Sequence, residues 1–554
     1  MTATDKTSQA STSDLPDWGR VLVTGGIDWP TLGRKATKNG PPLVINPEHP
    51  DLPSPHILRS VSNIRMRRIF SSHSSCHAVL LSVDGDAYIL GRNEQGQCGL
   101  PIRPESSSPK PSGTSIWNAY KLDRATDFIP PLPPTEAGDI VAAACGRSHT
   151  LLITASGSVY GTGLNTSGQC GLPNMSILST FQKIETAPFI KEKDPVVAAS
   201  CGNTFSMLLT KSGKVYTMGS SEKGQLGNGR TGEHFISGTK LAFNTFSEPF
   251  LVKQLADKKI VQLACGQQHT IAMDDEGFVY VWGFGGYGRL GLGSQQDQLL
   301  PTLVPQYARE NVLTRATAVF AGSTNSAVID GQRMFWLAGK WKTSGEGSAG
   351  QGFMTFKYLP DLMGVKVKNA GLGGVTLLCT AQEDASIQGE HQATMNICWG
   401  QNANCGELGL GEGKPRSATK PMRCETLDGI AILDIAAGQN TTFYLARNMG
   451  PAYSELPRFP EMVDSAETCL VCGSDNSTDE NALLECEKCE NPWHLKCLDP
   501  PLTEIPEGEW HCPRCAPATT SASAASNKRT AVSATAADED LHSASTPAAK
   551  KRRT

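Results

Sequence analysis

Apolar and polar positions follow the same order again and again along most of the chain. A segment of small residues ends in glycine, and three residues later an apolar run begins. A glycine turn and a second short apolar segment follow, and the unit closes on Gly-Gln-Leu-Gly or a relative of it. Clear copies occupy residues 141–171, 197–227 and 261–291, and weaker ones 71–99, 319–339 and 369–378 with 397–409. Short apolar runs between glycine turns are typical of β-strands, so each copy predicts a small antiparallel sheet.

One further copy is divided between the two ends of the chain. Residues 435–446 give its first half, and residues 21–35 give the missing second half, which makes seven units. Aligning the repeat glycine places the anchors at Ser74, Gly146, Gly202, Gly266, Gly322, Gly371 and Gly438. Their mean spacing is about 61 residues, and seven such units need about 425 residues, which agrees with a repeat region spanning residues 20–446.

A single unit of this size cannot bury its own apolar face, so the copies must pack on one another. Radial packing as the blades of a propeller buries those faces and leaves few exposed strand edges. An open solenoid is the alternative, but a copy shared by the two ends argues for a closed ring. The sequence therefore predicts an all-β fold with a seven-bladed β-propeller, one blade of which takes strands from both ends of residues 20–446.

The repeat also carries a family resemblance. Its Cys-Gly-x-x-His-Thr and Trp-Gly…Gly-Gln-Leu-Gly signatures resemble those of the regulator of chromosome condensation family, a family of seven-bladed propellers. The most telling segments are residues 29–35, 281–291 and 406–429. The resemblance covers residues 20–446 and implies, as one function, guanine-nucleotide exchange on a small GTPase.

His77, His149 and His269 share one repeat position, which raises the question of a metal site. Asn325 and Gly374 are aligned with them, and a ring would keep these positions far apart. We therefore expect hydrogen bonds at blade turns rather than metal ligation. Cys145, Cys201 and Cys265 follow small residues at another shared position and are expected to be buried core thiols.

Three segments depart from the repeat. Residues 101–135 are rich in proline and serine and predict an exposed loop with Ser-Pro phosphorylation sites, and residues 228–255 interrupt the spacing between two blades. Such loops on a rigid ring are where partner contacts are expected. The basic stretch Arg65–Arg68 is interpreted as a solvated edge in preference to a nucleic-acid contact.

Seven of the 17 cysteines lie close to the C-terminal end, and their spacing indicates metal. Without a secretory signal, disulfides explain such a cluster poorly. Four pairs of ligands follow one another with two residues inside each pair, and eight ligands suffice for two tetrahedral zinc ions. They are Cys469, Cys472, Cys486, Cys489, His494, Cys497, Cys512 and Cys515.

The order of four cysteines, one histidine and three cysteines resembles a PHD finger, and Trp510 stands two residues before Cys512 as in that family. The resemblance implies a cross-braced arrangement, with Cys469, Cys472, His494 and Cys497 on one zinc and Cys486, Cys489, Cys512 and Cys515 on the other. A RING-type ubiquitin ligase is the alternative, and the four-residue gap before His494 favours the PHD finger. Zinc catalysis is not expected, because four protein ligands leave no position open for water.

The charge of this module points to a basic peptide. Residues 466–515 hold eleven acidic and three basic residues, a net charge of −8. This field repels DNA and attracts cationic peptides. The PHD resemblance implies the N-terminal tail of histone H3 as the ligand, and Glu485, Glu487 and Glu490 are the candidate contacts. Trp493 and Trp510 are the only aromatic residues of the module and stand at positions of the fold, so an aromatic cage for trimethyl-lysine is not expected.

Composition sets the remaining expectations. The 554 residues carry a net charge of −4, and the longest apolar runs are too short to span a membrane. We expect a soluble intracellular protein. Its segments are a disordered N-terminus (1–19), the propeller (20–446), a linker (447–465), the PHD finger (466–516) and a disordered tail (517–554) that ends in the basic nuclear-import cluster Lys550–Arg553.

Together these features predict a nuclear, chromatin-associated adaptor without enzymatic residues. The finger, with two Zn²⁺ ions, would bind the unmodified histone H3 tail, alone or in the nucleosome, while the propeller binds a second protein. Sequence-specific DNA binding and membrane binding are not expected. Guanine-nucleotide exchange on a small GTPase, and a mitotic scaffold at centromeres or microtubules, are the alternatives.

Overall fold

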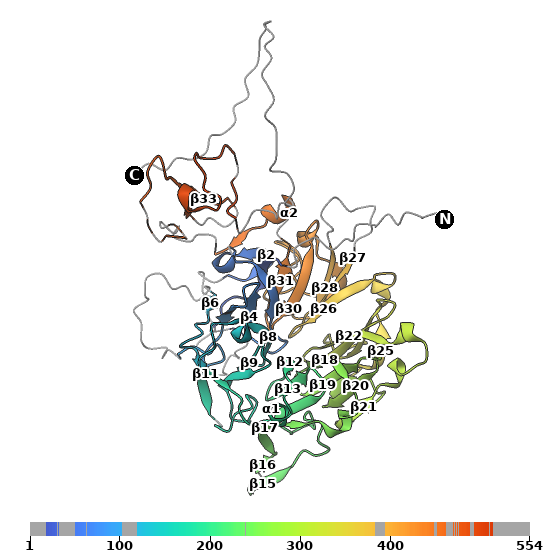
Figure 1. The fold of residues 1–554 in the computed structure, drawn as a ribbon. Helices are drawn as coiled ribbons and strands as arrows, with labels where there is room; N and C mark the ends of the chain where they lie inside the picture. The colour runs from blue at the N-terminus through green and yellow to red at the C-terminus, as the bar shows by residue number, and fades with distance from the viewer. Residues whose placement is uncertain are drawn as a thin grey trace, which may run out of the picture. The chain divides into compact units, whose positions relative to one another are not determined.

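The computed structural model describes two units of the chain, which are considered separately (Figure 1). The larger spans Asp17–Met462 and the smaller includes the cysteine-rich module. The described residues are 18–29, 32, 50–62, 64–101, 119–174, 176–238, 240–382, 394–447 and 451–460 in the larger unit, and 469, 471–472, 474, 476–487, 492–508 and 510–513 in the smaller. The N-terminal segment before residue 18, the tail from residue 514 and the cluster Lys550–Arg553 lie outside them.

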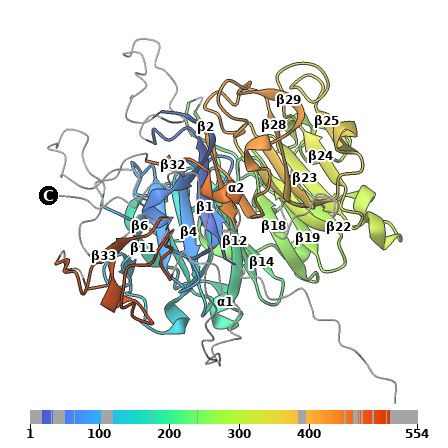
Figure 2. The same ribbon diagram turned by 90° about the horizontal axis from the view of Figure 1, so that it is seen from above.

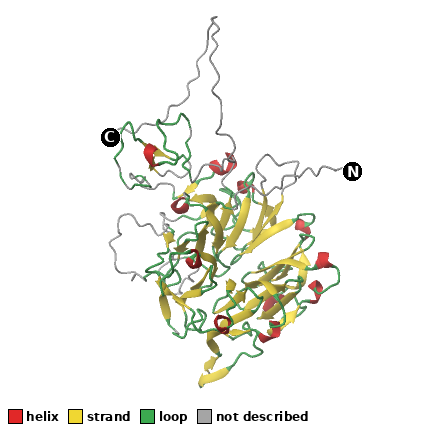
Figure 3. Cartoon of the chain, in the orientation of Figure 1, coloured by secondary structure: helices red, strands yellow, loops and turns green. Residues whose placement is uncertain are grey.

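The larger unit is a seven-bladed β-propeller, and strand is almost its only regular structure (Figure 3). Each blade is an antiparallel sheet whose strands follow one another from the inside outward. Blade 1 consists of β3 (Met66–Phe70), β4 (His77–Ser82), β5 (Ala87–Gly91) and β6 (Tyr120–Lys121), and blade 2 of β8 (Ile140–Cys145), β9 (His149–Thr154), β10 (Val159–Leu164) and β11 (Ile177–Lys183). Blade 3 consists of β12 (Val196–Cys201), β13 (Phe205–Thr210), β14 (Val215–Ser220) and β17 (Thr245–Leu251), and blade 4 of β18 (Ile260–Cys265), β19 (His269–Asp274), β20 (Val279–Gly283) and β21 (Gln298–Leu303). Blade 5 consists of β22 (Ala316–Ala321), β23 (Asn325–Asp330), β24 (Phe335–Gly339) and β25 (Phe353–Tyr358), and blade 6 of β26 (Val367–Leu372), β27 (Leu377–Gln382), β28 (Thr394–Gly400) and β29 (Ala418–Arg423).

Blade 7 joins the two ends of the repeat region, as predicted. Its strands are β30 (Ile432–Ala437), β31 (Thr441–Ala446), β1 (Arg20–Gly25) and β2 (Leu52–Leu58). Strand β1 pairs antiparallel with β31 along its whole length, and the Thr441 hydroxyl donates to the carbonyl oxygen of Gly26 at 2.5 Å. Because this sheet mixes distant parts of the chain, separating the first and last blades requires breaking a complete strand ladder.

The third strand of every blade has a glycine at its last or next-to-last position that the packing requires. These glycines are Gly91, Gly163, Gly219, Gly283, Gly339, Gly400 and Gly25, all with positive φ. A Cβ atom on any of them would lie 2.2–2.6 Å from a backbone carbonyl oxygen of the turn between the first and second strands. Only glycine accommodates both the left-handed backbone and this close approach, which explains why the repeat keeps it seven times.

Strand register corrects one detail of the predicted repeat. Leu372 pairs with Leu377 where Cys145 pairs with Thr150 in blade 2, so Gly373, not Gly371, is the anchor of blade 6. Thr376 accordingly takes the place of His149, and Gly374 does not. Three glycines in four residues made the alignment of this weak copy ambiguous.

Residues 447–465, predicted as a linker, contain structured elements that belong to the propeller. A short helix, α2 (Pro451–Ser454), is followed by β32 (Arg458–Phe459), which pairs parallel with β2 (Figure 2). Tyr453 and Phe459 are buried against blade 7. The burial of two aromatic side chains offsets the entropy of ordering this proline-rich segment.

The outer edges of the blades resist further strand pairing. β7 (Phe128–Ile129), which lies in the predicted loop of residues 101–135, covers the edge of blade 2 just as β32 covers blade 7. Proline occupies an equivalent edge position in four outer strands, at Pro55, Pro249, Pro301 and Pro421. Proline lacks the N–H group that another strand would need, so it protects an edge from aggregation.

The insertion at residues 228–255 projects from blade 3. It forms a two-stranded hairpin of β15 (His234–Ser237) and β16 (Lys240–Ala242), which extends away from the propeller, before β17 completes the blade (Figure 1). Phe235 is 70% and Ile236 62% exposed. These are large apolar surfaces to leave in water.

Helices are few and short in the described chain. They are α1 (Pro188–Lys191), α2 and the 3₁₀ turns η1 (Arg59–Val61), η2 (Glu136–Gly138), η3 (Lys253–Leu255), η4 (Gly286–Gly288), η5 (Pro305–Tyr307), η6 (Val312–Thr314), η7 (Pro360–Leu362), η8 (Glu425–Leu427) and η9 (Leu495–Cys497). Among the described residues, none of these helices has the length and apolarity to cross a bilayer.

The smaller unit is built around two short strands and a few buried side chains. Strand β33 (Leu483–Glu485) pairs antiparallel with β34 (Pro492–His494), and η9 follows directly. Leu484, Trp493, Leu495 and Leu498 pack with Cys486 and Cys512, and Trp510 covers them. So small an apolar core cannot stabilise a domain alone, and this unit needs an additional constraint.

Candidate metal centre

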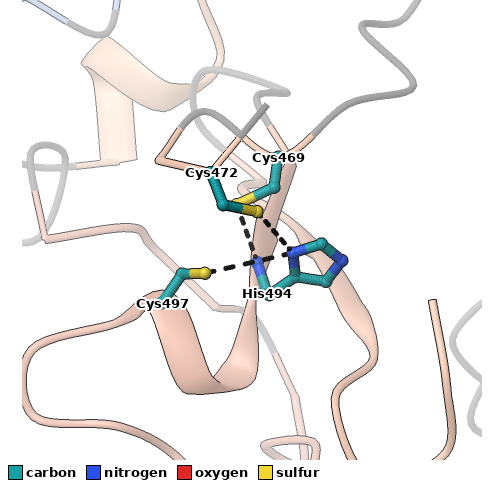
Figure 4. Close-up of side chains that lie close together, drawn as sticks. All are labelled: Cys469, Cys472, His494 and Cys497. Atoms are coloured by element: carbon teal, nitrogen blue, oxygen red, sulfur yellow. Dashed lines mark hydrogen bonds between the residues drawn. The ribbon is translucent and has the colours of Figure 1, made fainter. Parts of the chain in front are cut away.

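Four of the predicted zinc ligands converge in the smaller unit. The ligand atoms of Cys469, Cys472, His494 and Cys497 all lie within 4.8 Å of one another (Figure 4). His494 Nδ1 is 3.2 Å from the Cys472 sulfur and 4.0 Å from the Cys497 sulfur. These residues come from a turn, from the end of β34 and from η9, so the fold brings together ligands that are up to 28 positions apart in the sequence.

Backbone groups prepare this cluster for a cation. The Nε2 atom of His494 lies 2.9 Å from the carbonyl oxygen of Asn476, an arrangement that keeps the proton on Nε2 and leaves the lone pair of Nδ1 facing the sulfurs. Burial opposes ionisation of Cys469, but N–H groups of Cys472, His494 and Val471 donate to its sulfur and lower the pKa of the thiol to about 6. A thiolate and a neutral imidazole nitrogen are the ligand forms that zinc binds.

The donor set fits zinc. Zinc–ligand bonds of about 2.0–2.3 Å in a tetrahedron place the ligand atoms about 3.3–3.8 Å apart. The separations from His494 Nδ1 to the two sulfurs bracket this range. Three sulfurs and one imidazole therefore match a closed structural site.

Part of the predicted second site is also assembled. Cys486 and Cys512 are both buried, and the backbone N–H of Cys512 donates to the Cys486 sulfur at 3.3 Å. This contact joins positions 26 residues apart, just as the N–H of His494 donates to the Cys469 sulfur at 3.3 Å in the first site. Cys489 and Cys515 lie outside the described residues.

Strand β33 presents one edge away from β34. The N–H of Leu495 donates to the carbonyl oxygen of Ala482, so by the two-residue period of a strand Leu484 also faces β34. The backbone groups of Leu483 and Glu485 consequently face the other edge, where the Ser477 hydroxyl accepts from the N–H of Leu483 at 3.1 Å. Within the described residues the sheet has two strands only.

The predicted peptide contacts lie at or near this edge. The side chains of Glu485, on β33, and of Glu487, just after it, are exposed. Glu490 lies outside the described residues. Trp493 is buried in the core and Trp510 packs against it, in agreement with structural positions for both aromatic residues.

The histidines of the propeller have the structural role expected of them. The Nε2 atoms of His77, His149 and His269 lie 2.7, 2.8 and 2.9 Å from the hydroxyl oxygens of Thr150, Ser206 and Ser326, each in the next blade. They link neighbouring blades and do not meet one another. Cys145, Cys201 and Cys265 are buried, and burial raises the pKa of each thiol, to about 12 for Cys265.

The basic stretch Arg65–Arg68 is paired within the propeller. Arg65 lies 3.4 Å from Asp84 and Arg68 3.6 Å from Asp434, while Arg67 donates to the carbonyl oxygen of Ile140 at 3.2 Å. These contacts agree with an edge of the ring rather than with a nucleic-acid site.

Two buried polar residues escaped the sequence interpretation, His73 and Arg289. Both are 1% exposed. Two small features of the sequence could have indicated them. The turn that carries His73 is longer than in the other copies, and Arg289 stands where other copies have glutamine.

Comparison with known protein families divides the chain in the same place. The model of the RCC1-like domain matches residues 20–394, and that of the PHD-finger matches residues 469–515. Protein RCC2 of Mus musculus is 31% identical over 458 residues, which cover 80% of this chain and 79% of that protein. Protein RCC2 of Homo sapiens is 29% identical over the same shares. Residues 29–35, 281–291 and 406–429 resemble motifs of RCC2.

Solved structures agree on the fold. The chain of yeast RCC1 (Prp20) in a crystal structure with Kap60 bound has a TM-score of 0.60 at 15% identity, covering 81% of this chain and 97% of that one. Human WBSCR16 has a TM-score of 0.56 at 20% identity, covering 77% and 99%. Identities this low speak for the fold alone. Because the family model spans most of the chain and a 31% identical relative matches four-fifths of it, this protein belongs to the RCC1-like domain family and joins that propeller to a PHD finger.

Proposed function

We propose that this protein is a chromatin adaptor whose PHD finger, held by two Zn²⁺ ions, binds the unmodified N-terminal tail of histone H3. The carrying observation is the outward edge of β33 with Glu485 exposed on it, in a module of net charge −8. Cys469, Cys472, His494 and Cys497 hold the first ion, and Cys486, Cys489, Cys512 and Cys515 the second. The metal supplies structural stability, and the chain's own residues do the binding.

The peptide joins β33 as a third strand. The carbonyl oxygen of Leu483 and the backbone groups of Glu485 face that edge and supply main-chain hydrogen bonds, which are independent of the ligand's side chains. Specificity then comes from carboxylates: Glu485 meets a lysine, while Glu487 and Glu490 meet an arginine. Charge-assisted hydrogen bonds of this kind contribute about 1.5–3 kcal/mol each.

The preference for an unmodified lysine follows from the same chemistry. An ammonium group donates up to three hydrogen bonds to carboxylates, whereas a trimethylated nitrogen donates none and is held instead by aromatic faces. Trp493 is buried in the core, and the module holds no aromatic residue besides Trp493 and Trp510. Trimethylation therefore removes hydrogen bonds without gaining a cage.

Titration of zinc-loaded protein with two histone H3 tail peptides tests this function. The unmodified peptide should bind at least tenfold more tightly than the peptide trimethylated at the fourth-position lysine. Equal binding, or tighter binding of the trimethylated peptide, would refute the carboxylate mechanism. A scrambled peptide of the same charge measures the non-specific contribution of the acidic field.

The propeller would bind a second protein, and the β15–β16 hairpin is the candidate contact. Phe235 and Ile236 expose apolar area on a ribbon that extends from blade 3 (Figure 1). Burying two such side chains gives roughly 3–6 kcal/mol, enough to dominate a docking surface. Affinity purification with the wild type and with a Phe235→Ser, Ile236→Ser variant should yield a partner that only the wild type retains.

A small GTPase is the second candidate for that partner, and the propeller would then regulate it. The solved structure of Prp20p, a relative in fold, is described with that protein's binding to Gsp1p and to histones. The propeller would promote exchange by stabilising the nucleotide-free GTPase, which needs differential binding and no acid–base residue. Nucleotide-release assays over a panel of small GTPases decide this, and absence of acceleration across the panel would leave the adaptor function alone.

Nuclear localisation completes the proposal, with Lys550–Arg553 as the import signal. Replacing the four basic residues with alanine should move a fluorescent fusion to the cytoplasm. A mitotic scaffold is the remaining alternative, and it predicts centromere or microtubule staining that appears at mitosis and persists when the finger is disrupted.

A further inference from the structure

The turn between the first two strands of blade 1 is longer than its counterparts. In blades 2 and 4 the last strand pairs are Cys145–Thr150 and Cys265–Thr270, but in blade 1 the last pair is Phe70–Val79. The extra residues carry His73 into the interior, where it is 1% exposed. Neither ring nitrogen of His73 has a hydrogen-bond partner among the described residues.

The ring of His73 lies in the interior of the propeller. Burial, the larger influence, and the nearby charge of Arg289 together lower its pKa to about 3. His73 in turn contributes to the lowered pKa of His269. Arg289 and His269 belong to blade 4, three blades away from blade 1, and inner residues of such distant blades approach one another only across the centre of the ring.

Arg289 replaces the glutamine of the repeat and is buried with its charge. Gln97, Gln169 and Gln225 occupy the same place in the Gly-rich loops of blades 1 to 3. The Nε atom of Arg289 donates to the carbonyl oxygen of Gly286 at 2.9 Å, and Nη1 donates to that of Ser323 at 3.1 Å. The residue is 1% exposed, and burial lowers its pKa only to about 10, so it remains protonated at neutral pH.

The charge of Arg289 has aromatic but no carboxylate neighbours in direct contact. Its guanidinium lies 4.6 Å from the ring centre of Phe284. Within the part of the chain that the structure describes, no ion pair joins it to an acidic side chain, and Asp297 acts on it only through its charge from a distance. Taking a cation out of water without an ion-pair partner is strongly unfavourable. A bound anion would offset that cost.

The turn of His73 offers further donors beside this cation. The buried hydroxyl groups of Ser72 and Ser74 are without hydrogen-bond partners among the described residues. With one N–H of neutral His73 they provide three uncharged donors from a single turn. A cation facing several uncharged donors is the arrangement that binds phosphate, sulfate and carboxylate groups.

We propose that Arg289 and the turn Ser72–Ser74 form a binding site for a small oxyanion in the central channel of the propeller. Arg289 provides the charge, and His73, Ser72 and Ser74 provide directed hydrogen bonds. The site uses no residue of the finger and does not depend on the function proposed for it. Because the residues are buried, the site selects small anions over acidic side chains of a folded partner.

Calorimetric titration of the full zinc-loaded chain with sodium sulfate, at an ionic strength held constant with chloride, tests this site. Arg289→Gln is the informative variant because it restores the residue of blades 1 to 3. Arg147→Gln is the control, since Arg147 is an exposed arginine in the turn of blade 2 that corresponds to the turn of His73. We expect one sulfate per wild-type chain, the same affinity for the Arg147→Gln variant and at least tenfold weaker binding for Arg289→Gln.

Three results would overturn the proposal: no saturable binding to the wild type, wild-type affinity of the Arg289→Gln variant, or equal weakening by both substitutions. If the Arg289→Gln variant does not fold, as judged by its melting transition, His73→Ala takes its place. Wild-type affinity of the His73→Ala variant would also overturn the site. Replacing sulfate with phosphate or acetate then ranks the oxyanions by charge and size.

Discussion

The two ring nitrogens of His494 lie in different environments. Nδ1 lies 3.2 Å from the sulfur of Cys472, while Nε2 lies 2.9 Å from the carbonyl oxygen of Asn476. One nitrogen is thus committed to the backbone and the other to the metal cluster. This arrangement makes the finger's stability depend on a ligand geometry that its small core cannot maintain without metal.

Metal removal should therefore unfold the finger and leave the propeller intact. Structural zinc contributes about 10–16 kcal/mol in small finger peptides, more than the whole stability of a domain of this size. A chelator should abolish the dispersed NMR signals of residues 469–513 without moving the melting transition of the ring. His494→Ala should reproduce the effect at saturating zinc, and an unaltered finger in that variant would contradict the assignment.

Reversal of one charge on β33 should separate peptide binding from the general acidic field. Glu485→Lys should weaken binding of the unmodified histone H3 tail by more than tenfold, because it replaces an acceptor with a like charge. Glu504→Lys changes the net charge of the finger equally at another exposed position and is the control. A similar loss in both variants would mean that the field alone attracts the peptide.

The glycine that ends the third strand should be the least replaceable residue of each repeat. A Cβ atom at Gly283 would lie 2.5 Å from the carbonyl oxygen of Gln268, in addition to the strain of its φ of 96°. We expect Gly283→Ala to destabilise the propeller by about 3 kcal/mol or more.

Gly293 provides the control for that substitution, since it has a φ of 84° with no atom within 4 Å of an added Cβ. Gly293→Ala should cost only the backbone strain, about 1–2 kcal/mol. Denaturant unfolding measures both. Equal costs would show that the close approach to the turn is unimportant.

Glu407 should make the closing blades sensitive to pH. It replaces the repeat glutamine in blade 6 and is 1% exposed; its carboxylate accepts from the N–H of Cys405 at 2.9 Å. Burial, the largest influence, raises the pKa of Glu407 from 4.5 to about 7. Between these values the folded state binds more protons than the unfolded state, so stability falls as pH rises through the window, by up to about 3 kcal/mol.

Glu407→Gln should remove this dependence. The variant should melt at a higher temperature than the wild type above pH 7, and the difference should vanish as the pH falls to 4.5. Gln225→Glu places the same carboxylic acid in blade 3. We expect the melting temperature of this variant to fall relative to the wild type as the pH rises. Parallel melting curves of wild type and Glu407→Gln across pH 4.5–8 would contradict the raised pKa of Glu407.

The sequence was sufficient for the repeat, the ring and the four ligands that converge in the first metal cluster, because each is written in local spacing. Seven copies, one divided between distant segments, predict a closed propeller, and pairs of cysteines two residues apart predict zinc. The alignment failed by two residues in blade 6, where Gly371, Gly373 and Gly374 look alike until Leu372 is paired with Leu377. The predicted linker was wrong at α2 and β32 because two aromatic side chains find a surface of blade 7 that no local pattern reveals.

Local patterns therefore determined the repeated strands and the metal ligands that converge. Backbone preferences and the spacing within each ligand pair act over only a few residues. The fold alone decided which positions from separate blades meet. His73 of blade 1 and Arg289 of blade 4 are 216 positions apart and carry no motif in common. They lie near one another only because closing the ring brings distant blades to a common axis. Their removal from water at that axis determines their chemistry.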